Sequence, residues 1–256
     1  MKLTKNIKLL SNPQANYKAN KNIKLNNETY FLSFAHSDIS GYNVCPMANK
    51  LKANENNPNK SNCSKVCVGY NGNANRFKSI MKSRIKKTKM FFEDRQNFMN
   101  ALIKEIYLAI EKSNKKGFEA SFRLNAYSDI NWEKIKVEKF GNCSIFELFP
   151  DVQFYDCTKL ENRITPSNYS LTYSHYGKWN ATKKAIKKGL NVAMVFNKKD
   201  KLPKKYKGLS VVNGDENDLR TPKNDGKGVI VGLLAKMSKQ AIENELKKDQ
   251  SFIVNA

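Results

Sequence analysis

The feature that most constrains the fold is an alternation of apolar strands with short helical segments, which runs from residue 118 to near the end of the chain. The segments WEKIKVEKF (132–140) and WNATKKAIKKG (179–189) are predicted helices. Strands that alternate with helices indicate βαβ units and a parallel sheet. The predicted strands of this region are 118–129, 151–159, 167–174, 190–197, 208–216 and 228–236.

An earlier stretch, TYFLSFAH (29–36), is a seventh predicted strand. Together the strands predict an α/β fold, a complete or incomplete (β/α) TIM-like barrel with an N-terminal cysteine-containing loop region. At 256 residues the chain is long enough for one such barrel. We therefore expect a polar N-terminal arm over residues 1–28 and a single barrel-like domain over 29–256, in which apolar residues at helical spacing predict one or two long helices within 75–113.

The chain carries a large excess of positive charge. Its 46 Lys and Arg against 23 Asp and Glu give a formal net charge of +23. A surface of this sign attracts polyanions, so we expect a nucleic-acid partner, although codon usage in an AT-rich genome also raises the lysine content. The basic residues between 82 and 89 are either a solvated helix face or a set of phosphate contacts.

Membrane insertion and secretion are not expected. No apolar run approaches the roughly 18 to 20 residues that span a bilayer, and the N-terminus MKLTKNIKLL lacks the apolar core of a signal peptide. A cytoplasmic location follows. There the five cysteines predict metal ligation or burial rather than disulfides.

Three cysteines fall within one loop-rich region. Cys45, Cys63 and Cys67 have the spacing C-x17-C-x3-C, and thiolates bind zinc and iron–sulfur clusters well. We predict a metal-binding insertion around residues 45–72 that holds zinc, with His36 as the candidate fourth ligand. The alternatives are a [4Fe–4S] cluster with one open iron, and three unrelated cysteines.

Polar residues follow most of the predicted strands. In a parallel barrel the active site forms at the ends of the strands. Several carboxylates that meet there can serve as nucleophile, general acid and substrate ligand, because burial and neighbouring charges give them different pKa values. The alternative is that such residues cap the next helix, which fits Asp129 before INWEKI. The strand-end residues are Asn125, Asp129, Tyr155, Asp156, Ser174, His175, Asn197, Asp215, Asp218 and Arg220.

Eight blocks of sequence, in order over roughly residues 30–237, resemble a poorly characterised phage family, the gene-product-88-like proteins. This family looks like a group of distant relatives of the tRNA-guanine transglycosylases, zinc-containing (β/α) barrels, and is associated with phage 7-deazaguanine DNA modification. The transglycosylase zinc pattern, C-x-C-x2-C followed by a distant His, is absent here. The blocks are SDISGYNVCP, CSKVCVGYNG, RIKKTKMFFEDRQNFMNAL, FRLNAYSDINWE, FPDVQFYDCTK, GLNVAMVF, VVNGDENDLR and GVIVGLLAK.

The resemblance implies base exchange in DNA. An Asp carboxylate attacks C1′ of a deoxyguanosine, guanine leaves, and a 7-deazaguanine such as a preQ0-type base displaces the enzyme. The location would be the bacterial host cytoplasm. A radical-SAM-like iron–sulfur enzyme and a non-catalytic basic DNA-binding phage protein stay open as alternatives. The implied residues are Asp129, Asp156 and Asp218 for catalysis, Asn125, Tyr155, Ser174, Asn197 and Asp215 for the substrate, and Arg84, Lys87 and Arg220 for DNA.

Overall fold

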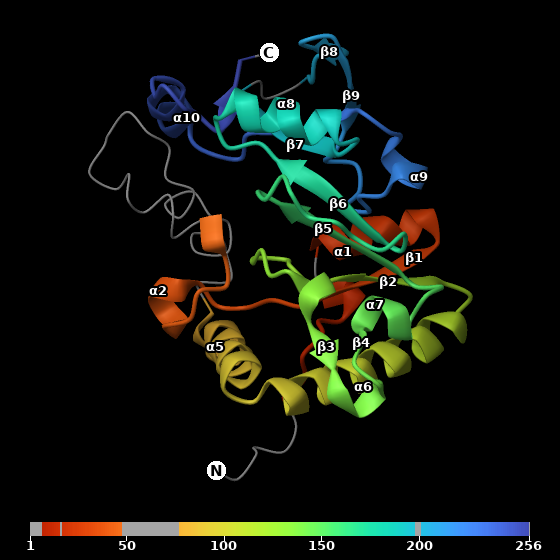
Figure 1. Cartoon of the computed structure of the whole chain (residues 1–256). Helices are drawn as coiled ribbons and strands as arrows, with labels where there is room; N and C mark the ends of the chain where they lie inside the picture. The colour runs from red at the N-terminus through yellow and green to blue at the C-terminus, as the bar shows by residue number, and fades with distance from the viewer. Residues whose placement is uncertain (1–6, 16, 48–76, 198–200, 256) are drawn as a thin grey trace. The chain divides into compact units, whose positions relative to one another are not determined.

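The computed structural model describes residues 7–15, 17–47, 77–197 and 201–255 (Figure 1). Contacts between these residues group them into two compact units. The first unit takes the described residues up to 46, then 77–154 and 165–169. The second takes residue 47, residues 155–164 and the described residues from 170 onward. Each unit combines helices with a mostly parallel sheet.

The first unit holds two parallel strand pairs and two long helices. β1 pairs with β2 and β2 pairs with β5, both in parallel, whereas β3 and β4 form a small antiparallel pair. Parallel neighbours need a long crossover connection, and the two helices α5 and α6 lie in the connection from β1 to β2. Its elements are η1 (Pro13–Ala15), α1 (Tyr17–Asn20), η2 (Lys21–Leu25), β1 (Asn27–Phe31), α2 (Ser37–Ser40), α5 (Lys78–Glu93), α6 (Arg95–Asn114), β2 (Glu119–Arg123), η4 (Trp132–Lys134), β3 (Lys136–Val137), η5 (Glu138–Phe140), β4 (Cys143–Ser144), α7 (Ile145–Leu148) and the start of β5 (Gln153–Thr158).

Helices α5 and α6 occupy the region 75–113 in which one or two long helices were predicted, and they are separated at Asp94. There the backbone leaves helical geometry, with φ −145° and ψ 65°. Beyond the break, α6 buries one apolar face that includes Phe98 and Leu102. The core of the unit is aromatic: the ring centroid of Phe34 lies 5.1 Å from that of Phe91 and 5.8 Å from that of Phe98.

Part of the predicted N-terminal arm packs on this core. Leu9 and Leu10 are buried, and Leu10 forms an antiparallel bridge with Leu32. The carboxylate of Glu105 on α6 accepts hydrogen bonds from the N–H groups of Leu9 and Leu10 at 2.6 and 2.8 Å. The segment just before η1 is therefore fixed to the first unit by both apolar burial and backbone hydrogen bonds.

The second unit is built around β7, which pairs in parallel with β6, β10 and β11. Its strand order is β5-β6-β7-β10-β9-β8. Strands β8 and β9 pair in antiparallel, whereas β9 pairs with β10 in parallel. Helix α8 packs on β7 (Figure 1), over a core that includes Tyr173, Val192 and Phe196. Its elements are β5, β6 (Tyr169–Ser174), α8 (Trp179–Lys187), β7 (Asn191–Phe196), β8 (Lys205–Tyr206), β9 (Leu209–Asn213), α9 (Pro222–Asp225), β10 (Ile230–Leu234), α10 (Lys239–Leu246) and β11 (Ile253–Val254).

The predicted α/β class with a mostly parallel sheet is confirmed. Neither unit closes into a barrel within the described ranges, since the strand orders β1-β2-β5 and β5-β6-β7-β10-β9-β8 both have open ends. Among the described residues, no helix is both long and apolar enough to cross a membrane.

Each of the seven predicted strands overlaps an observed strand, although β1 begins at Asn27, before the predicted range 29–36, and the predicted helix over 179–189 contains α8. The predicted helix over 132–140 is wrong, because two 3-10 turns flank the short strand β3 there. In this segment Ile135 and Val137 alternate with Lys134 and Lys136. That period of two is the strand pattern, and Val137 on β3 is fully buried.

Candidate functional site

A polar cluster of the second unit forms where the connection from β9 to β10 meets β5. Tyr155 on β5 is fully buried, and its hydroxyl donates to a carboxylate oxygen of Asp218, with 3.4 Å between the two oxygens. This distance is long for an O–H···O hydrogen bond. Asp218 itself is half-buried, so its carboxylate reaches the protein interior and keeps contact with solvent.

A buried ion pair stands in the same connection. The side chains of Arg220 and Asp225 are 5% and 4% exposed, and Nη1 of the guanidinium lies 3.2 Å from Oδ1 of the carboxylate. Nη2 of Arg220 also donates to the main-chain and side-chain oxygens of Asn217, at 2.7 and 2.6 Å. Nδ2 of Asn224 donates to Oδ1 of Asn217 and of Asp225, at 3.1 and 2.9 Å. These bonds fix the pair in one arrangement.

The local sequence explains how Asp225 returns to Arg220. Thr221 caps α9, because its hydroxyl accepts from the N–H of Asn224 at 3.3 Å. Pro222 begins the helix, where its fixed φ suits the first turn. Gly226 ends it with φ 85°, a conformation that glycine adopts without strain. One short helical turn therefore brings the carboxylate back onto the guanidinium.

The pair is not fully hydrogen-bonded. Asp225 Oδ2 and Arg220 Nε are buried and have no hydrogen-bond partner in the described part of the chain, and such atoms are uncommon in folded proteins away from functional or strained sites. Burial raises the pKa of Asp225, whereas Arg220 and Asn224 lower it and the charge of Asp218 raises it further. Two neighbouring carboxylates in unequal environments can act as nucleophile and proton carrier.

Asp156 lies on the other face of β5. It is fully buried and directly follows Tyr155. Successive side chains of a strand point to opposite faces, so the Asp156 side chain leaves β5 on the face opposite that of Tyr155. A carboxylate with this degree of burial requires polar or charged neighbours.

The end of β6 carries a basic and aromatic group. Lys159 Nζ donates to the Ser174 hydroxyl at 2.8 Å and lies 5.6 Å from the ring centroid of Tyr176. Nδ1 of His175 lies 2.7 Å from the Thr182 hydroxyl oxygen. Burial, together with the charges of Lys159 and Lys207, lowers the pKa of His175 to about 4. The imidazole of His175 is therefore uncharged at physiological pH, and it takes part in hydrogen bonds as a neutral ring.

Two other predicted substrate residues hold strands together. Asp215 accepts from the N–H of Leu234 at 2.8 Å and from Nζ of Lys236 at 2.8 Å, so its carboxylate joins the end of β9 to the end of β10. Asn197 donates through Nδ2 to the side-chain oxygen of Asn255 at 2.8 Å, beside β11. These contacts bridge neighbouring strands, and neither of them is the helix cap that the alternative interpretation describes.

In the first unit, Asn125 and Asp129 shape the turn after β2. Oδ1 of Asn125 accepts from the Ser128 hydroxyl, the N–H of Ile130 and the indole N–H of Trp132, at 2.7, 2.9 and 3.1 Å. Asp129 is 3% exposed, and its own N–H donates to the carbonyl of Val44. The helix-capping position predicted for Asp129 is taken by Asn131 instead.

The predicted DNA-binding residues are all buried. Arg84 stacks on Tyr127, with its guanidinium carbon 4.4 Å from the ring centroid. Lys87 donates to the carbonyl of Leu9 at 2.7 Å, and burial lowers its pKa to about 8. Arg220 is occupied by the ion pair with Asp225. The exposed cations of α5 are Lys78, Lys82, Lys86 and Lys89.

Of the four predicted metal ligands, Cys63 and Cys67 lie outside the described residues. His36 precedes α2, where its Nδ1 accepts from the N–H of Asp38 at 3.3 Å, and Cys45 is half-buried. Within the described ranges, no group of three or more His, Cys, Asp or Glu residues is placed to hold a metal ion. The predicted zinc site therefore depends on the two cysteines that are not described.

Sequence reasoning missed Asp225, Asn217 and Asn224, the partners of Arg220. The available signal was the pair Thr221-Pro222, which marks a helix start and hence a turn that folds the chain back. Spacing alone does not pair Arg220 with Asp225, since they stand five positions apart in a segment without regular periodicity.

Comparisons with known proteins give one match. The family model described as Gene product 88 matches residues 1–254. No curated protein and no solved structure matches the chain.

Proposed function

Because the chain belongs to the gene product 88 family, a phage-type family, we propose that it is a DNA-modifying base-exchange enzyme that replaces guanine by a 7-deazaguanine. The observation that carries the proposal is the contact of Asp218 with Tyr155 in the loop that also holds the buried Asp225–Arg220 pair. Enzymes that cleave glycosidic bonds with retention use one carboxylate as nucleophile and a second acid. The interpretation of the fold as an incomplete (β/α) barrel belongs to the same proposal.

In the proposed reaction Asp218 is the nucleophile. One of its carboxylate oxygens forms a bond to C1′ of a deoxyguanosine while the bond from C1′ to N9 breaks, and guanine leaves with the bonding electron pair and takes up a proton. Asp225 carries that proton, since burial raises its pKa. The incoming base then returns its N9 proton to the Asp225 carboxylate, bonds to C1′ and releases the Asp218 carboxylate, so no oxidant or reductant is needed.

DNA is the proposed substrate because of the charge. A formal net charge of +23 favours a polyanion, and the exposed lysines of α5 offer phosphate contacts on one helix. A base inside a duplex must be extruded to react. Zinc held by Cys45, Cys63, Cys67 and His36 is part of the proposal as a structural ion, and none of the steps above passes through it.

The test is incorporation of labelled 7-deazaguanine bases, including a preQ0-type base, into duplex DNA, followed by digestion to nucleosides. Asp218→Asn should lower incorporation by at least about 10³-fold, as loss of a nucleophile does. Asp249→Asn is the matched control, because Asp249 is exposed and lies in the same unit. A covalent protein–DNA adduct, trapped by denaturation, should form with the wild type and be lost in Asp218→Asn.

Other outcomes of this experiment would change the nucleophile or overturn the proposed activity. If Asp156→Asn or Asp129→Asn abolishes the adduct and Asp218→Asn does not, the nucleophile is the other carboxylate. If no base enters DNA while DNA still binds, the protein is a non-catalytic DNA-binding protein. Metal analysis of the same preparation separates zinc from an iron–sulfur cluster, which would be brown and would bleach on reduction.

A further inference from the structure

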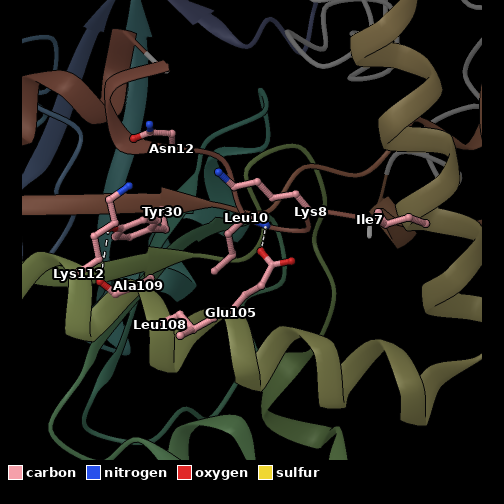
Figure 2. Close-up of a pocket in the computed structure, with 9 residues that line it drawn as sticks. All are labelled: Ile7, Lys8, Leu10, Asn12, Tyr30, Glu105, Leu108, Ala109 and Lys112. Atoms are coloured by element: carbon pink, nitrogen blue, oxygen red, sulfur yellow. Dashed lines mark hydrogen bonds between the residues drawn. The ribbon is translucent and has the colours of Figure 1, made fainter. Parts of the chain in front are cut away.

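The first unit contains a cavity of about 360 Å³ between α6 and the segment that precedes η1 (Figure 2). One wall is a single stripe of α6: Glu105, Leu108, Ala109 and Lys112 are spaced as i, i+3, i+4 and i+7, so they lie on one face of the helix. Leu108 is 51% exposed, whereas Leu102 on the same helix is fully buried. This wall offers an apolar surface that the described residues leave uncovered.

The hydrogen-bond acceptors of the cavity are already engaged. Both carboxylate oxygens of Glu105 accept from backbone N–H groups of the opposite wall, at 2.6 and 2.8 Å. The hydroxyl of Tyr30 lies 3.0 Å from the Ser113 hydroxyl, 3.3 Å from Glu28 Oε2 and 3.4 Å from the Ala109 carbonyl. These groups hold the walls in place and are not available as the main partners of a ligand.

The uncommitted polar groups of the cavity are all donors. Lys8 and Lys112 form no ion pair or hydrogen bond with any other residue that the structure describes, and the amide nitrogen of Asn12 donates to none of them. Oδ1 of Asn12 accepts from the N–H of Gln14. In Figure 2, the ends of Lys8, Lys112 and Asn12 extend toward the same side of the pocket. A ligand must therefore supply acceptors and negative charge on that side.

We propose that this cavity binds an amphiphilic anion. Its apolar part rests on Leu10 and Leu108, and its carboxylate or phosphate lies between the ammonium groups of Lys8 and Lys112. At about 30 Å³ for each water-sized group, the cavity holds roughly a dozen non-hydrogen atoms, which is the size of a ten-carbon carboxylic acid. A carboxylate and a phosphate head satisfy the same donors, so the shared chemistry is an anionic head on a short apolar tail.

Isothermal titration at low salt, below the critical micelle concentration, tests this proposal with decanoate and decyl phosphate as probes. Binding is expected below about 1 mM for at least one of them. The double variant Lys8→Ala, Lys112→Ala should weaken it by about tenfold, because each exposed ion pair contributes roughly two- to fivefold. Lys104→Ala is the matched control, since Lys104 is an exposed cation of the same helix that does not line the cavity.

Leu108→Glu provides a second test. It places a negative charge on the apolar wall at a half-exposed position and should abolish binding, while the circular dichroism melting curve shows that the variant is folded. The proposal is wrong if neither probe binds, or if the double variant binds both as tightly as the wild type. It is also wrong if decanol binds as well as decanoate, or if deoxyguanosine monophosphate binds in place of both probes.

Discussion

His175 should make the stability of the protein depend on pH in the acidic range. It is 7% exposed, and burial, followed by the charges of Lys159 and Lys207, lowers its pKa from 6.5 to about 4. Between these values the unfolded chain binds a proton that the folded protein does not. The stability from this residue is thus complete above pH 6.5 and is lost as the pH falls toward 4, and the difference corresponds to about 3 kcal/mol.

Urea unfolding of the wild type and of His175→Gln at pH 7.5 and pH 4.5 measures this contribution, with the fluorescence of Trp179 as a reporter, since its ring centroid lies 6.2 Å from that of His175. Carboxylates that titrate in both proteins cancel in the difference between them. The wild type should lose about 2 to 3 kcal/mol relative to the variant on going from pH 7.5 to pH 4.5.

A control variant separates burial from hydrogen bonding. Thr182→Val removes the hydroxyl that lies 2.7 Å from Nδ1 of His175 and leaves the imidazole in place. Because burial is the largest cause of the lowered pKa, this variant should keep most of the pH dependence. A difference between the wild type and His175→Gln that is the same at both pH values would refute the reasoning.

Three further predictions concern charge. Because burial lowers the pKa of Lys87 to about 8, the wild type should gain stability relative to Lys87→Met as the pH rises from 8 toward 10.5, measured by urea unfolding at pH 7.5 and 10. Asp225→Leu leaves a buried guanidinium without its counter-ion and should lower the free energy of unfolding by roughly 3 to 5 kcal/mol, measured by thermal melting. If both lysines contact phosphate, the double variant Lys82→Ala, Lys86→Ala should bind duplex DNA with a slope of log K against log salt that is smaller by about 2. Fluorescence anisotropy at several salt concentrations measures this slope, and an unchanged slope would exclude phosphate contacts by both lysines.

The strands were predictable because their signal is local. In LNVAMVFN, for example, an unbroken apolar run of residues 192–196 lies between Asn191 and Asn197, and buried strands of parallel sheets have this pattern. The prediction of a helix over 132–140 was wrong because the lysines and glutamates of this segment favour a helix by propensity, while the alternation of Ile135 and Val137 with lysines favours a strand. Burial of Val137 decides between the two. Closure of a barrel depends on long-range pairing, which no local pattern reports.

The residue types of the candidate site were predictable, but their pairing was not. The ends of the predicted strands drew attention to Tyr155, Asp218 and Arg220. Which of them contact one another depends on the path of the connection from β9 to β10, and that path is set by the short helix α9 rather than by strand periodicity. The burial of the basic residues was not predictable either, because lysines and arginines are usually exposed, whereas Arg84 and Lys87 are buried against partners distant in sequence.

Asp215 and Asp218 show why the structure is needed to rank candidates of the same kind. They stand three residues apart in one acidic loop, and the sequence offers no reason to prefer either. Asp215 accepts from the backbone of β10 and from Lys236, so proton uptake or bond formation there would weaken a strand contact. Asp218 meets a buried phenol at a long distance and influences the pKa of a second, buried carboxylate. A nucleophile must form a new bond without disrupting the sheet that positions it, and the contact of Asp215 with the backbone of β10 counts against that role for Asp215.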